Sequence, residues 1–185
     1  MYHIKEDPRQ KKSADLITEG MLSLLCDSAL PPQKTPTIAD ICRQAGVSRA
    51  TFYRLFDSPD DILSYYFDTI FDNILECCAD KKKAGVPYSP AEVYSTWFTE
   101  HQRSIAGMLR HGKVHILMEA HRKALYRHAD TLFPEMDKDS DEFTFFSEMR
   151  TGVLAGAARA WFRTGRQAGP ADLIAFCESQ LRFRF

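Results

Sequence analysis

Residues 37–56 read TIADICRQAGVSRATFYRLF, and this stretch decides the fold. Thr37 and Asp40 have the spacing of a capping box, which predicts the start of a helix. We expect Gly46 to end this helix after about two turns and Ser48 to cap the next one. Two short helices joined by a tight turn that contains glycine form a helix-turn-helix, whose second helix can enter the major groove of DNA.

The side chains of this stretch separate into an inner and an outer set. The apolar set predicted to face a core comprises Ile38, Ile41, Cys42, Ala45, Val47, Phe52 and Phe56. The set left outside near the start of the second helix comprises Arg49, Ala50, Thr51 and Tyr53, where side chains can reach base edges and phosphates. The alternative is a helix pair that serves packing alone.

Apolar residues recur at helical spacing along nearly the whole chain, and no stretch alternates as a half-buried strand does, so the sequence predicts an all-α fold. The other expected helices span residues 8–27, 59–82, 90–109, 113–128, 142–165 and 170–183, and three prolines break the chain between 29 and 36. We expect two domains. Residues 1–61 form a DNA-binding domain with the helix-turn-helix, and residues 62–185 form a helical ligand-binding and dimerisation domain.

The composition allows only a local nucleic-acid surface. The 185 residues carry a net charge of -1, and residues 1–56 hold eight Lys or Arg against six Asp or Glu.

The five cysteines show no CxxC spacing and are expected to be reduced thiols. The N-terminus lacks the apolar core of a signal peptide, and the small apolar run 152–158 is far below the roughly 20 residues of a membrane span. We therefore expect a soluble, cytoplasmic protein with no membrane partner.

Residues 37–56, followed by SPDDIL at 58–63, resemble the N-terminal signature of the tetracycline-repressor (TetR) family of bacterial transcriptional regulators. The stretch GVLAGAARAWFRTGR at 152–166 is similar to the penultimate helix of many members. The resemblance implies a homodimer that binds a double-stranded DNA operator, a repressor that a small organic inducer releases. It places Thr37 and Tyr53 on phosphates, and Arg49, Ala50 and Thr51 at bases.

Three departures from the family pattern concern DNA binding. Pro59 stands where the family usually has a lysine that supports a phosphate contact, and Leu55 where a histidine or tyrosine is common. Prolines replace the usual glycine-containing turn at 29–36. Fewer phosphate contacts would weaken binding and flatten its salt dependence. We still expect the N-terminus of the helix at Pro59 to offer free amides to a phosphate.

The C-terminal region carries small residues that let helices approach closely. By the resemblance, the last two helices pair with their symmetry mates in a dimer interface that includes Gly152, Gly156, Ala160, Leu173, Phe176 and Cys177. An ordinary intramolecular core is the alternative, because an apolar helix face does not reveal its partner.

The middle helices supply candidates for a mostly apolar ligand pocket: Trp97, Phe98, His101, Met108, His115, Met118, Phe146 and Met149. For each of them plain core packing is the alternative. His111, His115 and Glu119 have a spacing that could chelate a metal, but a solvated face explains them as well, so we predict no metal site and no cofactor.

The sequence contains no P-loop, GxSxG, HExxH or GxGxxG motif, so we predict no catalytic residue and no enzyme activity. Two alternatives to a regulator remain open. One is a helical interaction or ligand-binding protein that has lost operator binding, and the other is an enzyme built on a helical bundle.

Overall fold

The computed structural model describes residues 1–87, 90–165, 169, 172 and 179. Its helices, in chain order, are α1 (Pro8–Cys26), α2 (Ile38–Ala45), α3 (Arg49–Leu55), α4 (Pro59–Lys83), α5 (Pro90–Arg110), α6 (Val114–Arg127), α7 (Ala129–Leu132) and α8 (Asp141–Arg163). Over these residues the only β pairing is an isolated bridge between Tyr2 and Phe56. The prediction of an all-α fold is confirmed.

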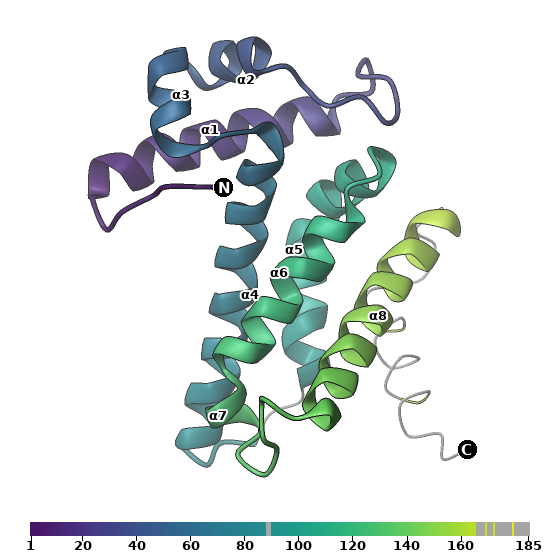
Figure 1. The fold of residues 1–185 in the computed structure, drawn as a ribbon. Helices are drawn as coiled ribbons and strands as arrows, with labels where there is room; N and C mark the ends of the chain where they lie inside the picture. The colour runs from purple at the N-terminus through teal and green to yellow at the C-terminus, as the bar shows by residue number, and fades with distance from the viewer. Residues whose placement is uncertain (88–89, 166–168, 170–171, 173–178, 180–185) are drawn as a thin grey trace.

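The helices form a small unit and a larger bundle (Figure 1). α1, α2 and α3 make a small unit at one end, and α4 leads from it into a bundle with α5, α6 and α8. Ile17, Met21, Ile41, Phe52 and Phe56 are fully buried in the small unit. Burial of these apolar side chains holds the three helices together, and α2 and α3, with eight and seven residues, are too short to be stable alone.

Local sequence signals fix most helix starts. The carboxylate of Asp7 accepts a hydrogen bond from the Arg9 amide at 2.9 Å, with Pro8 at the first position of α1. Ser140 caps α8 by accepting from the Phe143 amide at 3.2 Å. Apart from 170–183, the predicted helix limits agree with the structure to within about two residues, which is the usual uncertainty of helix ends.

The core of the bundle is aromatic and includes the buried imidazole of His121. His121 lies 2.8 Å from the Tyr94 hydroxyl and 2.8 Å from the Thr151 hydroxyl, so it links α5, α6 and α8. The ring of Phe71 contacts it from α4 with a centroid separation of 5.0 Å. Burial, with a smaller contribution from Arg150, lowers the pKa of His121 to about 3, so the imidazole is neutral.

The small unit and the bundle touch through the ends of α1 and α5. A Cβ at Gly107 would lie 3.1 Å from the carbonyl oxygen of Leu25, so only glycine permits this approach without a shift. The guanidinium of Arg110 donates to the carbonyl oxygens of Asp27 and Ser28 at 3.2 and 3.1 Å. These contacts satisfy carbonyls at the end of α1 and fix α5 against it.

Two features were not expected from the sequence. α7 forms a separate short turn where a single helix end was predicted, and the residues before α1 pair with the end of α3, where the His3 amide donates to the Leu55 carbonyl at 2.8 Å. The predicted helix 170–183 lies outside the described residues.

α4 runs unbroken through the expected domain boundary at 61–62, so the division into two domains stays a prediction. In the described part, no helix has the length and apolar character to cross a bilayer.

Candidate nucleic-acid interface and ligand groove

The start of α2 is held by its own cap. The Thr37 hydroxyl accepts from the Asp40 amide at 3.2 Å and donates to the Asp40 carboxylate at 2.6 Å. This hydrogen bond, together with the neighbouring Arg43 guanidinium, lowers the pKa of Asp40. Thr37 is exposed, as expected for a residue near DNA, although its hydroxyl proton is already engaged within the protein.

A left-handed glycine sets the turn between α2 and α3. Gly46 has φ 66° and ψ 30°, a conformation that side chains other than glycine rarely adopt. Its amide donates to the Arg43 carbonyl, and the Val47 amide donates to the Cys42 carbonyl at 3.0 Å. The predicted turn is confirmed, and it fixes the direction in which α3 leaves the unit.

α3 presents an outer face at the edge of the molecule. Ser48 caps it by accepting from the Thr51 amide at 3.1 Å, and the two hydroxyls lie 3.0 Å apart. Arg49 and Ala50 are exposed, Thr51 is half-buried, and Tyr53 is 56% exposed. Of the five predicted DNA-contact residues, Arg49, Ala50 and Tyr53 are thus accessible on α3, Thr51 is partly covered, and Thr37 is exposed at the start of α2; their contacts with DNA stay a prediction.

The inner face of α3 anchors it to the core. Phe52 is fully buried, and the Tyr53 ring meets its edge with a centroid separation of 5.5 Å. Leu55, a departure from the family pattern, is also fully buried. Its side chain belongs to the hydrophobic core, so the leucine does not leave a gap in the exposed face.

The start of α4 differs from the expected free helix end. Pro59 occupies the first helical position and has no amide hydrogen, and the Asp61 carboxylate accepts from the Ser58 amide at 2.8 Å and from its hydroxyl at 2.9 Å. Asp60 lies between them and pairs with Lys113. The prediction of amides open to a phosphate is therefore wrong, because carboxylates occupy this helix end.

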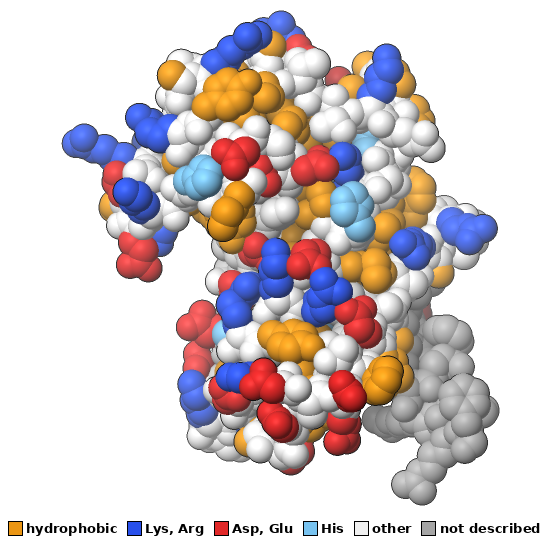
Figure 2. All heavy atoms as spheres, viewed as in Figure 1, with side chains coloured by type: hydrophobic (Ala, Val, Ile, Leu, Met, Phe, Trp, Pro, Cys, Tyr) orange, Lys and Arg blue, Asp and Glu red, His pale blue; other side chains and the backbone are white. Residues whose placement is uncertain are grey.

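Charge is distributed unevenly over the surface. Arg43, Arg49 and Arg54 are exposed on α2 and α3, and Figure 2 shows basic side chains projecting from the outer edge of this end of the molecule. Acidic side chains are frequent at the opposite end. A local positive edge on a chain of net charge -1 is the arrangement that the composition required for DNA binding.

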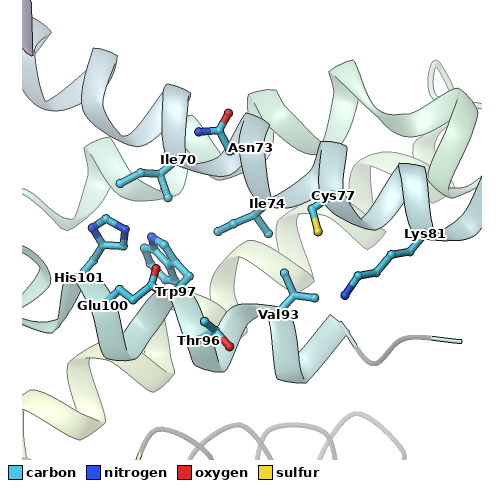
Figure 3. Close-up of a pocket in the computed structure, with 10 residues that line it drawn as sticks. All are labelled: Ile70, Asn73, Ile74, Cys77, Lys81, Val93, Thr96, Trp97, Glu100 and His101. Carbon is cyan, nitrogen blue, oxygen red and sulfur yellow. The ribbon is translucent and has the colours of Figure 1, made fainter. Parts of the chain in front are cut away.

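A groove of about 390 Å³ lies between α4 and α5 (Figure 3). It is lined by Ile70, Asn73, Ile74, Cys77 and Lys81 of α4 and by Val93, Thr96, Trp97, Glu100 and His101 of α5. The Tyr66 hydroxyl and His101 Nδ1 share a hydrogen bond of 2.7 Å, and burial lowers the pKa of His101. The groove thus combines an apolar floor with a neutral imidazole and two charged side chains.

The predicted ligand residues do not form one site. Trp97 and His101 line the groove, whereas Phe98 packs on Trp161 with a centroid separation of 4.9 Å, and Met108 is fully buried. Met118 and Phe146 are half-buried, and His115 and Met149 are exposed. Sequence reasoning missed the α4 wall, although its spacing of three and four residues places those side chains on one helix face.

The candidate metal ligands His111 and His115 lie in different environments. His111 is 3% exposed and faces the end of α1, while His115 one turn later is exposed. Burial is the main cause that lowers the pKa of His111. No group of three His, Cys, Asp or Glu that could hold a metal ion occurs within the described ranges. Cys77 is exposed and Cys78 is buried, so the two thiols point to different sides.

One face of α8 is uncovered in the described protomer. Gly152, Gly156 and Ala160 are exposed, and a Cβ at either glycine would meet no atom within 4 Å. Phe145 and Met149 extend this face with 75% and 57% exposure. Leu173, Phe176 and Cys177, also predicted for the dimer interface, lie outside the described residues.

Comparison with known proteins supports the fold. No protein-family model matches the chain, and no curated protein matches it. Among solved structures, a TetR transcriptional regulator from Streptococcus agalactiae 2603V aligns with a TM-score of 0.58 and 19% sequence identity over 95% of this chain and 97% of that chain. The chain therefore has the fold of that regulator, a helix-turn-helix unit followed by a helical domain.

Proposed function

We propose that the chain is a DNA-binding transcriptional regulator of the TetR type, which acts as a homodimer and represses its target genes until a small organic inducer releases it. The observation that carries the proposal is α3, a capped helix whose inner residues Phe52 and Leu55 are buried and whose outer residues Arg49, Ala50 and Tyr53 are exposed at the edge of the molecule. A helix presented in this way fits the major groove.

In this proposal α3 reads bases and its neighbours contact the backbone. Arg49 has the reach and the paired donors to recognise a guanine edge. The Tyr53 and Thr37 hydroxyls contact phosphates, which position the protein without reading sequence. The half-buried Thr51, whose hydroxyl lies by Ser48, offers its methyl group to a base.

The homodimer explains the uncovered face of α8. Phe145 and Met149 are large apolar side chains in open solvent, and the exposed glycines beside them allow a second helix to approach closely. Pairing this face with its symmetry mate would place two copies of α3 on the same side of the dimer. Two-fold DNA readers then contact half-sites about 34 Å apart.

An inducer acts by favouring a conformation in which the distance between the two copies of α3 no longer matches the spacing of the DNA half-sites. The structure offers a route from the bundle to the DNA-binding unit. α4 passes through both, and the α5–α6 turn holds the first turn of α4 through Lys113 and Asp60. Movement of α5 or α6 against α4 would therefore tilt the small unit.

The test is binding of the purified chain to a duplex from the region upstream of its own gene, measured over a salt series beside a scrambled duplex. We expect salt-dependent binding that prefers the upstream duplex, and loss of the preference in Arg49→Ala. A folded protein that binds neither duplex would overturn the proposal. It would favour the alternatives of an interaction or ligand-binding protein without operator binding, or of an enzyme on a helical bundle.

A further inference from the structure

The groove between α4 and α5 contains a buried donor that nothing satisfies. The indole of Trp97 is 4% exposed, and its Nε1 has no hydrogen-bond partner among the described residues. Figure 3 shows this nitrogen on the side of the ring that faces the space between the two helices. Unpaired buried donors are uncommon in proteins, and they often mark a place that a ligand or an ordered water completes.

A carboxylate lies at the same end of the groove. Glu100 follows Trp97 by three residues on α5, so the two side chains lie on neighbouring turns of one helix face. His101 completes this end as a neutral group, because its Nδ1 is engaged by Tyr66 and burial disfavours its charged form. A second carboxylate would be repelled here, whereas a group that both accepts and donates a hydrogen bond is well matched.

The opposite end of the groove is cationic. Lys81 lines it from the last turns of α4, and among the described residues its ammonium forms no ion pair. Trp97 packs on Phe71 with a centroid separation of 5.2 Å, and ten residues along α4 separate Phe71 from Lys81. That separation is about 15 Å along the helix axis. Ile74 and Val93 supply an apolar surface between the two ends.

We propose that this groove binds an elongated organic acid that carries a hydroxyl group at the end opposite its carboxylate. The carboxylate pairs with the Lys81 ammonium, and the carbon chain covers Ile74 and Val93. The hydroxyl oxygen accepts from Trp97 Nε1, and the hydroxyl proton is donated to the Glu100 carboxylate. Because Nε1 is closed to water in the described structure, ligand entry requires a side-chain shift at this end of the groove.

The ligand would be the effector of the regulator. This role rests on the proposed function, whereas binding to the groove does not. An elongated ligand spans α4 and α5 at once, and those helices lead to Asp60 and to Arg110, which contact the other half of the molecule. Filling the groove therefore changes the spacing of the two helices that support the DNA-binding unit.

Three matched probes test the chemical class by isothermal titration calorimetry on the full chain: 10-hydroxydecanoate, decanoate and 1,10-decanediol. Decanoate lacks the hydroxyl group, and the diol lacks the charge. We expect 10-hydroxydecanoate to bind at least about tenfold more tightly than either, since each missing group forfeits a charge-assisted hydrogen bond. Equal affinities, or no binding of 10-hydroxydecanoate, would overturn the proposal.

Variants of Lys81 and Glu100 test the two ends of the proposed binding groove. Lys81→Met should weaken 10-hydroxydecanoate about tenfold or more and leave the diol unchanged, whereas Glu100→Gln should remove most of the advantage of 10-hydroxydecanoate over decanoate. Lys83→Met and Glu76→Gln are the controls, because both residues are exposed on α4 and outside the groove lining. Loss of binding in a control to the same extent would place the ligand elsewhere.

Tryptophan fluorescence gives a readout that does not depend on affinity. The chain has two tryptophans, and Trp161 packs on Phe98 away from the groove lining. In Trp161→Phe, emission from Trp97 should shift on addition of 10-hydroxydecanoate, and an unchanged spectrum at saturation would contradict the contact with Nε1.

Operator binding measured with and without 10-hydroxydecanoate tests the effector role. Groove binding that leaves operator affinity unchanged overturns the effector role, while ligand binding by a chain that binds no DNA overturns the proposed function alone.

Discussion

Lys113 and Asp60 join the two halves of the molecule. The ammonium of Lys113, in the turn between α5 and α6, lies 2.8 and 2.9 Å from the two carboxylate oxygens of Asp60 in the first turn of α4. The Lys113 side chain is 17% exposed and that of Asp60 41%. The pair neutralises one of the carboxylates at the end of α4 that is nearest to α3.

Lys113→Met should therefore weaken DNA binding more than it weakens the fold. The loss of a partly exposed ion pair costs about 1 kcal/mol or less, which corresponds to a fall in melting temperature of about 2–4 °C. The freed Asp60 carboxylate would repel phosphate, so operator affinity should decrease. Lys138→Met is the matched control, because Lys138 pairs with Asp130 at 2.7 Å far from α3. The idea fails if both variants bind the operator equally well.

Arg49→Ala and Tyr53→Phe should have different effects on DNA recognition. Arg49→Ala should cost about 1–3 kcal/mol and relax preference at one or two base pairs, whereas Tyr53→Phe should weaken all duplexes about equally. Binding to a panel of singly substituted operators measures both effects. The same relaxation in both variants would show that the division into base and phosphate contacts is incorrect.

Pro59→Lys should strengthen binding to specific and nonspecific DNA alike. A lysine at the first turn of α4 adds a cation beside Asp60 and Asp61 and should release one more counterion, which steepens the salt slope by about 0.9. The cost to folding should be under about 1 kcal/mol, because proline is helpful but not required there. Pro134→Lys, on an exposed loop after α7, controls for net charge. Coincident slopes for Pro59→Lys and the parent would mean that the start of α4 does not approach the DNA backbone.

Gly156→Glu should separate the dimer without unfolding the protomer. A Cβ at this position meets no described atom within 4 Å, so the protomer accommodates the side chain, while a carboxylate buried at a close helix crossing would be unpaired. Sedimentation should report a species near 21.2 kDa with unchanged far-ultraviolet circular dichroism. Thr144→Glu, exposed elsewhere on α8, should remain dimeric. An unfolded Gly156→Glu chain would indicate that this face packs within the protomer.

His121 should make the fold sensitive to acid. Its pKa of about 3 in the folded state lies below the ordinary value of 6.5. Between these two pH values the imidazole is protonated in the unfolded chain and neutral in the folded chain. The free energy of unfolding should then fall as the pH drops from about 6.5 toward 3, by about 1.4 kcal/mol per pH unit from this residue. His121→Gln should be less stable at pH 7 and show a shallower pH dependence in urea denaturation. Parallel pH profiles would contradict a neutral, buried imidazole.

Leu55 illustrates where reading the sequence against a family pattern fails. The family pattern commonly has a histidine or tyrosine at this position, which makes Leu55 a departure that concerns DNA binding, yet its side chain is fully buried. The helix is only seven residues long, and its last turn meets the segment before α1, where the His3 amide donates to the Leu55 carbonyl. Which face of so short a helix is covered depends on these neighbours and not on its own spacing.

The sequence by itself determined the order and approximate limits of the described helices other than α7, because their starts and ends depend on residues a few positions apart. Ser48 caps α3 through Thr51, and Gly46 ends α2 because it can adopt a positive φ. Only the tertiary structure decided which apolar side chains line a groove, that Lys113 pairs with Asp60, and that His121 lies between Tyr94 and Thr151. Those partners lie 27 to 53 residues apart, so their contacts follow from how whole helices pack and have no local signature in the sequence.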